Sequence, residues 1–544
     1  MVQAQRRSRR SGLVQVPGGP MWQQDQRVSS SPLSGRLWFL LVASVAALLC
    51  LPFIRAVFGM GGDEAVLLNG AERMLRGATI YVDFFEFLPP GGFVLTQIWF
   101  GAFGVSFFSA RSLAILVVVG IACFTYLACR QACKNDLVSV LLSIGWVVTS
   151  QGIWTQISHH WFTTLFAMVT VYVTLFGIED AHRRRRWPLI AGTAAGMAAM
   201  ITTHRGAIVA LFGLVAFLNV RRRLPELIAY VIGCTLVPGL LIVYLIGHHA
   251  LAAAFNDVIL FTAARYAAIQ GVSFGFGDQT PLTYLFPLAA LMAVLLYISD
   301  WHKWRRDRLL LQCSAFALAG FIGCFPRPDV VHIAYSAPLA CPLFAYCVVR
   351  IAQRWRSRWW RYRYVFVVTA GTLLGLCAPT VIFFVQLAHE ALRMNAVPTP
   401  RGNVVIFGPI GAGGPELLAQ IEERPREEAF FFYPVLAKVA FLAAREQVSK
   451  YDVFVPGYTS KSQYHETCLA VMRFASWVVI DRRWTDPVQL KYWFPAMVDA
   501  EPKEATSFTE ALDHGFEFFM QAGAFEMRRR RASTSDALCA PIVE

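Results

Sequence analysis

The stretch from Gly59 to Arg111, GMGGDEAVLLNGAERMLRGATIYVDFFEFLPPGGFVLTQIWFGAFGVSFFSAR, guides the interpretation of the whole chain. It follows the first long apolar segment and opens with Asp63 and Glu64, so two carboxylates stand beside a predicted membrane span. A carboxylate driven into lipid is costly, so acids in this position tend to face water or a cavity. The same pair also suits a helix start at 65–75, because acids favour helix N-termini. The pair is therefore either a helix cap or part of a polar site.

The composition is that of a membrane protein. Of the 544 residues, 56% are hydrophobic and only 15% are charged, whereas about 25% of the residues in soluble domains are charged. Several apolar runs reach the ~20 residues that a helix needs to cross the hydrocarbon core. The first run, 37–58, is too long for the core of a signal peptide. The chain is thus predicted to be an all-α polytopic membrane protein with a soluble extension.

The net charge of +14 does not indicate nucleic acid as a partner. The basic residues stand in short clusters between apolar runs, at 183–186, 221–223, 303–308 and 350–363. This positive-inside pattern orients spans and contacts anionic membrane lipid. The clusters therefore mark the predicted cytoplasmic side.

Alternation from these clusters predicts about eleven spans, with the N-terminus in the cytoplasm. After the first, the spans are predicted at 109–129, 137–153, 160–178, 188–203, 206–220, 227–247, 284–299, 309–325, 333–349 and 364–388. The run 91–103 is shorter and is predicted to be an interfacial helix. The predicted units are a disordered basic arm (1–35), a transmembrane domain (36–390) with a first external loop (59–108), and an extracytoplasmic domain (391–544).

The tail 391–544 is more polar than the rest of the chain. Strands are predicted at 404–407 and 477–480, and helices at 417–422 and 435–444, which indicates a small α/β or α+β domain.

Two further features of the tail concern cysteine and glycine. Cys468 and Cys539 can pair if the tail faces an oxidising compartment. The glycine-rich run 408–414 lacks the Gly-Lys-Ser/Thr ending of a phosphate loop, so nucleotide binding is disfavoured.

The order of parts in the first loop resembles the GT-C superfamily of membrane glycosyltransferases, in particular the protein O-mannosyltransferase and aminoarabinose transferase branch. The matching positions are Asp63, Glu64, Gly77, Tyr81, Pro89, Pro90, Gly104 and Arg111. The segment 430–458 also resembles the tail domains of bacterial members. Where the family often has a basic residue before the Pro-Pro pair, this chain has Phe87 and Leu88.

The resemblance implies transfer of a sugar from a polyprenyl-phosphate donor to a lipid, glycan or protein acceptor, at the outer face of the inner membrane. Such a reaction needs a base for the acceptor hydroxyl, and a single carboxylate base inverts the sugar configuration. Asp63 is the predicted base. Glu64 is predicted to orient Asp63 or the sugar, because neighbouring helix residues project about 100° apart.

Cations are needed for the departing phosphate. Arg327 is the first candidate, because a guanidinium presents paired N–H donors to phosphate oxygens. Arg205 and His332 are predicted to assist, and an ion pair with Asp329 is the alternative role of Arg327. The other predicted substrate-binding residues are Tyr81, Asp83, Glu86, His159, His160 and Asp329.

Some of these residues have plainer alternatives. Asp83 and Glu86 are alternatively solvated loop charges, and His159 and His160 are alternatively helix caps. A divalent cation between Asp63 and the phosphate is compatible with the set but not required by it. A zinc site built from the two histidines needs a third ligand.

A transporter or flippase of a lipid-linked sugar is the alternative function. A transporter is expected to have internally repeated halves, and broken spans with charged residues at the membrane midplane. The polar residues cluster instead at one predicted membrane face, and the Asp63–Glu64 pair is present. The sequence therefore favours an enzyme.

Overall fold

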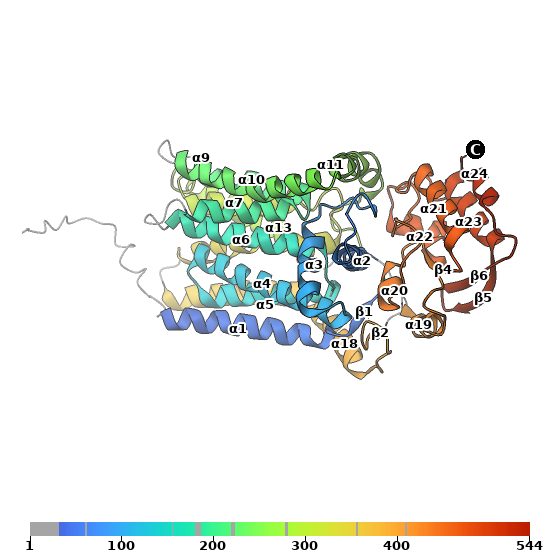
Figure 1. Cartoon of the computed structure of the whole chain (residues 1–544). Coiled ribbons are helices and arrows are strands. Elements are labelled where there is room, and N and C mark those ends of the chain that lie inside the picture. Colours follow the sequence, from blue (N-terminus) through green and yellow to red (C-terminus); the bar gives the residue numbers. More distant parts are fainter. Residues whose placement is uncertain are drawn as a thin grey trace, which may run out of the picture.

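The computed structural model describes residues 32–59, 62–154, 156–179, 186–218, 224–277, 281–354, 357–407 and 411–543. The predicted arm 1–35 lies almost wholly outside these ranges, as do the basic residues 221–223 and part of the glycine-rich run, 408–410. The described residues form a helical bundle and a separate unit of helices and strands, with short elements between them (Figure 1).

Each predicted span corresponds to helix in the bundle. The helices are α1 (Pro32–Cys50), α4 (Phe107–Cys133), α5 (Asp136–Ile153), α6 (His159–Glu179), α7 (Arg186–Ala199), α8 (Thr203–Gly213), α9 (Val215–Leu218), α10 (Leu224–Gly247), α13 (Leu285–Ser299), α14 (Trp301–Trp304), α15 (Arg308–Ile322), α16 (Val330–Ser336), α17 (Cys341–Ala352) and α18 (Arg358–Arg393). Within the described residues, six helices are long and apolar enough to cross a membrane, or seven if a bent pair is one span.

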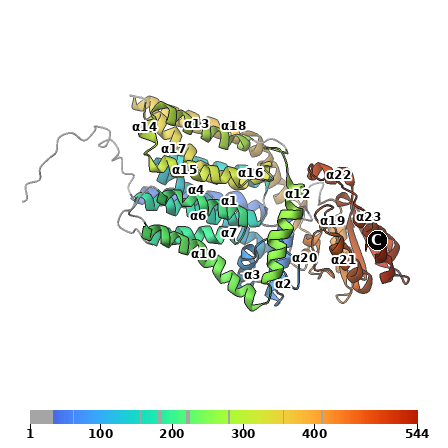
Figure 2. The same ribbon diagram turned by 90° about the horizontal axis from the view of Figure 1, so that it is seen from above.

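One of the six candidate spans, Leu251–Gln270, falls in a region predicted to be an external loop. It consists of α11 (Leu251–Ala254), the π-helical segment η3 (Phe255–Tyr266) and α12 (Ala267–Gln270). Figure 2 shows α12 at the end of the bundle that lies toward the unit of helices and strands. This helix therefore lies beside the boundary between the two units.

The first span ends earlier than the sequence predicted. Helix α1 ends at Cys50, a turn η2 (Leu51–Phe53) follows, and Ala56–Phe58 is strand β1 rather than helix. Pro52 accounts for the break, because proline has no N–H to continue the helix and its ring clashes with the preceding turn. Strand β1 pairs in parallel with β2 (Val405–Phe407), which ties the first loop to the beginning of the tail.

The predicted span 333–349 is divided into two helices. Helices α16 and α17 meet at an angle of 58° and are joined by the turn η5 (Ala337–Leu339). Pro338 and Pro342 lie at this junction and remove backbone donors, which explains the bend. As a result the short helix α16 contacts both α5 and α6.

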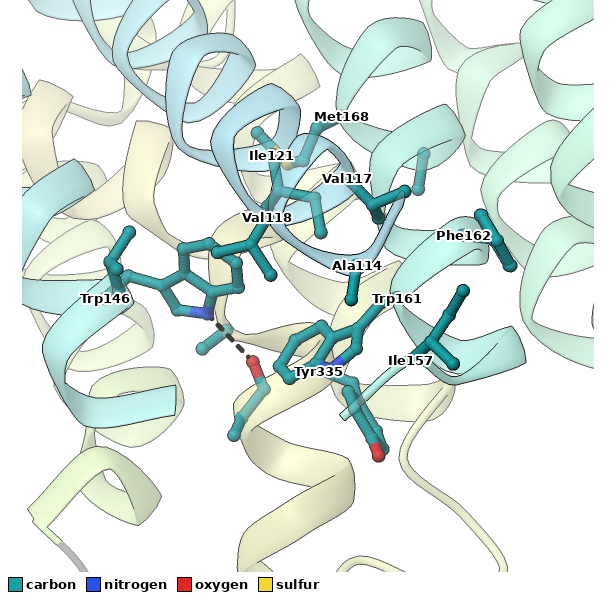
Figure 3. Packing of buried hydrophobic residues seen from close by; sticks show 14 of the residues in the cluster. Ala114, Val117, Val118, Ile121, Trp146, Ile157, Trp161, Phe162, Met168 and Tyr335 are labelled. Carbon is teal, nitrogen blue, oxygen red and sulfur yellow. Dashed lines mark hydrogen bonds between the residues drawn. The ribbon is translucent and has the colours of Figure 1, made fainter. Parts of the chain in front are cut away.

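An aromatic core fills the space between these helices (Figure 3). The indole N–H of Trp146 donates to the carbonyl of Ala334 at 3.0 Å, and Trp161 packs edge-on against Trp146 and Tyr335. All three aromatic side chains are buried, and burial of one large apolar side chain contributes about 1.5–3 kcal/mol. The core thereby anchors Tyr335, whose ring stacks on His160 at 4.5 Å between centroids.

The first loop contains two helices, α2 (Asp63–Leu75) and α3 (Gly91–Phe103). Helix α3 lies across the end of the bundle, in the orientation predicted for an interfacial helix (Figure 1). The two helices pack closely at Gly70, where a Cβ atom would lie 2.6 Å from the ring of Phe93. This contact fixes α2 over α3.

The C-terminal unit, residues 411–543, contains a four-stranded sheet in the order β3-β4-β6-β5. Strands β3 (Phe430–Tyr433) and β4 (Trp477–Asp481) are parallel, and β6 (Phe525–Arg530) is antiparallel to β4 and to β5 (Phe516–Ala522). The helices are α19 (Gly414–Glu422), α20 (Ala437–Leu442), α21 (Lys461–Phe474), α22 (Pro487–Trp493), α23 (Lys503–Gly515) and α24 (Ala540–Val543). Cys468 and Cys539 form a disulfide bond here.

Candidate active site

Asp63 and Glu64 have different surroundings at the start of α2. The Asp63 side chain is 45% exposed and its Oδ2 atom lies 4.0 Å from Nδ1 of His159. The Glu64 side chain is fully buried. Gly62 precedes the helix with a φ of 90°, a conformation that glycine adopts without strain. Of the two acids, Asp63 is therefore the one open to a substrate.

Glu64 is held by four donors. Its Oε1 atom accepts from Nη1 of Arg111 at 2.7 Å and from the backbone N–H of Ile157 at 3.1 Å. Its Oε2 atom accepts from Nη2 of Arg111 at 3.1 Å and lies 3.0 Å from Nζ of Lys438. Burial lowers the pKa of Lys438, and Glu64 opposes this change. These contacts fix the Glu64 side chain, and its role in orienting Asp63 or the sugar stays a prediction.

Three histidines and an arginine form a cluster that reaches Asp63 through His159. His159 and His160 begin α6, and their rings are 3.9 Å apart between centroids. The ring of His332 lies 4.8 Å from that of His160. Arg205 is buried, donates to Nδ1 of His160 at 3.1 Å, and donates to the hydroxyl of Ser336 at 2.9 Å. The bend between α16 and α17 allows this set to gather.

Asp329 connects the histidines to Arg327. Its Oδ1 atom accepts from Nδ1 of His332 at 2.7 Å, and its Oδ2 atom accepts from Nε of Arg327 at 2.8 Å. Arg327 also donates to Gln270 at 3.0 Å and to the carbonyl of Trp493 at 2.8 Å. The ion pair predicted as the alternative role of Arg327 is thus present. It orients the guanidinium and does not preclude a phosphate contact.

Tyr81 and Glu86 brace the loop between α2 and α3. The hydroxyl of Tyr81 donates to the carbonyl of Leu88 at 2.7 Å. Glu86 is buried, and its Oε1 atom accepts from the N–H groups of Phe87 at 3.0 Å and Leu88 at 3.2 Å. These contacts shape the backbone before the Pro-Pro pair. Both side chains therefore contact the backbone of the loop itself.

Asp83 lies apart from the other predicted residues. Its side chain accepts from the N–H of Thr79 at 2.6 Å in an exposed turn. This geometry matches the alternative of a solvated loop charge.

The buried position of Glu86 predicts that the stability of the folded protein depends on pH. Burial raises its pKa from 4.5 to about 8, although two backbone hydrogen bonds act in the opposite direction. Because the folded-state pKa is raised, the protonated folded form is favoured at low pH, and this contribution is lost as the pH rises from about 4.5 toward 8. A difference of one between the folded-state and unfolded-state pKa corresponds to about 1.4 kcal/mol of stability.

Glu86→Gln keeps the acceptor oxygen and removes the titration. We therefore expect Glu86→Gln to unfold at a higher temperature than wild type near pH 8, with the difference shrinking toward pH 5. The measurement is thermal unfolding of detergent-solubilised protein across this range. A difference that stays constant with pH would contradict the assignment.

Seven predicted residues form one continuous row of side chains. The row runs from Asp63 through His159, His160, His332 and Asp329 to Arg327, with Arg205 attached at His160.

Sequence reasoning missed Lys438, which contacts Glu64, and Tyr335 and Ser336, which contact His160 and Arg205. A lysine inside the apolar run 435–444 was an available signal, since a buried charge needs partners. Gln156 Oε1 accepts from Nζ of Lys438 at 3.2 Å.

Asp63, His159 and His160 are, within the described residues, the set with the best arrangement for a metal ion. Their ligand atoms lie within 4.8 Å of one another, and Nδ1 of His159 is buried without a hydrogen-bond partner in the described part of the chain. However, Nδ1 of His160 accepts from Arg205, so the neutral ring carries its proton on Nε2. Neither ring nitrogen of His160 is then a suitable ligand. The remaining pair falls short of the three protein ligands of a catalytic zinc site.

We therefore expect Zn²⁺ to leave the unfolding temperature of the wild type unchanged. A zinc ion bound at 100 times its Kd would add about 2.7 kcal/mol of stability, which thermal unfolding detects. A saturable rise in unfolding temperature that His159→Ala abolishes would contradict this expectation.

The fold of the chain is similar to that of solved membrane-protein structures. The chain is similar to the solved structure of ArnT from Cupriavidus metallidurans bound to undecaprenyl phosphate, with a TM-score of 0.53 and 13% identity over 93% of this chain and 99% of that one. It is also similar to the Archaeoglobus fulgidus oligosaccharyltransferase tethered to an acceptor peptide, with a TM-score of 0.52 and 12% identity over 92% and 74%. No protein-family model and no curated protein matches the chain.

Proposed function

We propose that the chain is an integral membrane glycosyltransferase. It takes a sugar from a polyprenyl-phosphate donor and passes it to a lipid, glycan or protein acceptor. The observation that carries the proposal is the half-exposed carboxylate of Asp63 at one end of the polar row, with the guanidinium of Arg327 at the other. Two solved structures with a similar fold contain a ligand of the kind proposed here: ArnT is bound to undecaprenyl phosphate, and the oligosaccharyltransferase is tethered to an acceptor peptide.

The row supplies what an inverting displacement needs. Asp63 accepts the proton of the acceptor hydroxyl while the acceptor oxygen bonds to the anomeric carbon and the carbon–phosphate oxygen bond breaks. The departing phosphate keeps the bonding electrons and gains negative charge, which Arg327 and Arg205 stabilise. His159 and His160 lie between the two ends, beside the position of the sugar.

The proposed topology has about eleven spans with the active site and the C-terminal unit outside. Two observations support it. The disulfide between Cys468 and Cys539 is typical of an oxidising compartment outside the cytoplasm. Asn69 in the first loop donates to the carbonyl of Ala437 in the C-terminal unit at 2.9 Å, so both lie on one side of the bundle. The proposed location is the inner membrane, with the N-terminus in the cytoplasm.

The proposed function is tested with purified protein in proteoliposomes. Labelled polyprenyl-phosphate sugars and candidate acceptors are supplied together, and the glycosylated product is separated from the donor. We expect transfer that depends on the lipid carrier, with inversion of the anomeric configuration in the product. Product that retains the configuration of the donor would contradict a single displacement by one carboxylate base.

A transporter of lipid-linked sugar is the second candidate. The bent pair α16–α17 favours it, because broken helices near a polar site are common in transporters. The polar row ends in an acid suited to proton transfer, however, and this favours chemistry over transport.

A further inference from the structure

Lys438 belongs to the C-terminal unit, yet its ammonium group lies beneath the first turn of α2. In addition to Glu64 at 3.0 Å, its Nζ atom contacts the side-chain oxygen of Gln156 at 3.2 Å and the carbonyl of Phe58 at 3.3 Å. The side chain is fully buried. An ammonium group has three donors, and these three contacts use all of them.

Glu64 does not need the positive charge of Lys438 for its own neutralisation. Arg111 already pairs with both oxygens of Glu64, so one carboxylate meets two cations. Burial of an ammonium costs several kcal/mol, and a hydrophobic side chain of similar volume would often pack as well. The nearby negative charge that remains is Asp63, one residue before Glu64 on the same turn. The second cation, Lys438, therefore lies at the helix turn that carries the proposed base, Asp63.

Further contacts cross the same boundary between the units. The amide of Asn69, on α2, donates to the carbonyl of Ala437, the residue before Lys438, at 2.9 Å. At the other end of the polar row, Arg327 donates to the carbonyl of Trp493 at 2.8 Å, and its guanidinium lies over the ring of Phe494 at 5.3 Å. The C-terminal unit thus contacts the supports of the site at both ends.

We propose that the C-terminal unit completes the active site, with Lys438 as a positioning residue that fixes Asp63 relative to His159. This inference rests on the proposed function. Lys438 holds Glu64 and Gln156 at the same time, and these residues lie in the parts of the chain that carry the two site residues. The separation between Asp63 and His159 is then set by a side chain from a different unit.

The test compares Lys438→Met, Lys438→Arg and a matched control, Lys450→Met, in the transfer assay. Lys438→Met leaves the neutral, doubly bonded pair of Arg111 and Glu64, so the variant is expected to fold. Misplacement of a reacting group by about 1 Å costs on the order of 100-fold in rate. We expect Lys438→Met to lower kcat by about 10- to 100-fold with little change in KM for the donor.

Two further variants, Lys438→Arg as the rescue and Lys450→Met as the control, are measured in the same assay. Lys438→Arg keeps a cation and donors, and we expect it to regain a large part of the lost kcat. Lys450 lies in the same unit with a partly exposed side chain paired to Glu466 at 2.8 Å. Lys450→Met is expected to have wild-type kcat.

Two results with Lys438→Met would overturn the inference while the proposed function stands. One is a folded Lys438→Met variant with wild-type kcat. The other is a rise in KM with kcat unchanged, which would mean that Lys438 binds the donor. If Lys438→Met aggregates, Gln156→Leu carries the same test, because it removes one Lys438 contact without changing charge, and an unchanged kcat then overturns the inference. A wild-type protein without transfer activity overturns the proposed function and this inference together.

Discussion

Replacement of Asp63 by asparagine is expected to lower sugar transfer by roughly 100-fold or more, the scale of a lost general base. Asparagine has nearly the same size as aspartate but cannot accept the proton of the acceptor hydroxyl. The Asp63 side chain is half exposed, and its Oδ2 atom lies 4.0 Å from Nδ1 of His159, beyond hydrogen-bond distance, so the fold should tolerate the change. The measurement is kcat for transfer from a labelled polyprenyl-phosphate sugar in proteoliposomes.

The matched control for this prediction is Asp83→Asn. Asp83 is an exposed acid of the same loop with a local contact to Thr79. We expect this variant to retain wild-type transfer. Donor binding by Asp63→Asn should also be retained, which separates lost chemistry from lost affinity. If Asp63→Asn transfers sugar at the wild-type rate, Asp63 is a helix cap and not the base.

Replacement of Arg111 by methionine is expected to have the largest effect on stability. The Arg111 side chain is 2% exposed and pairs with both oxygens of the fully buried Glu64. It also donates to the carbonyl of Ala56 at 2.7 Å. Removal of one partner of a buried pair typically costs about 3–5 kcal/mol. We expect a sharp fall in the yield of monodisperse protein after solubilisation, measured by size-exclusion chromatography.

Arg130→Met is the comparison for this variant. Arg130 lies on the same helix, α4, but its side chain is 34% exposed where it pairs with Asp136 at 2.7 Å. This pair is more exposed to solvent than the pair of Arg111 and Glu64, and the contribution of an ion pair falls toward about 0–1 kcal/mol with exposure, so the loss of yield should be smaller than for Arg111→Met. Equal yields for Arg111→Met and Arg130→Met would show that the buried pair does not hold the first loop in place.

Much of the fold was predictable from the sequence because membrane spans leave a strong local signal. Runs such as 109–129 and 227–247 need no knowledge of distant residues to be identified. The end of the first span was predicted wrongly, since strand β1 forms by pairing with β2, which lies far along the chain. Its short length gives no periodic pattern that distinguishes it from the end of a helix.

Those parts of the candidate site whose residues follow one another closely along the sequence were predictable. Asp63, the Pro89–Pro90 pair and Arg111 follow one another in this order within the stretch 59–111. By contrast, Lys438 reaches Glu64 through the packing of two separate units, and no spacing in the sequence reveals that contact. Glu86 illustrates a different difficulty. Burial raises the pKa of Glu86, and the burial of this side chain cannot be predicted from the polar sequence of the loop.

A doubly labelled donor tests the central claim most directly. Polyprenyl-phosphate sugar carrying one label on the sugar and another on the phosphate is placed in proteoliposomes with the wild-type protein and an acceptor fraction. An enzyme breaks the sugar–phosphate bond, so we predict that the sugar label moves to the acceptor while the phosphate label stays with the lipid. If both labels cross the bilayer together and stay on one molecule, the protein is a transporter and the assignment as a glycosyltransferase is wrong.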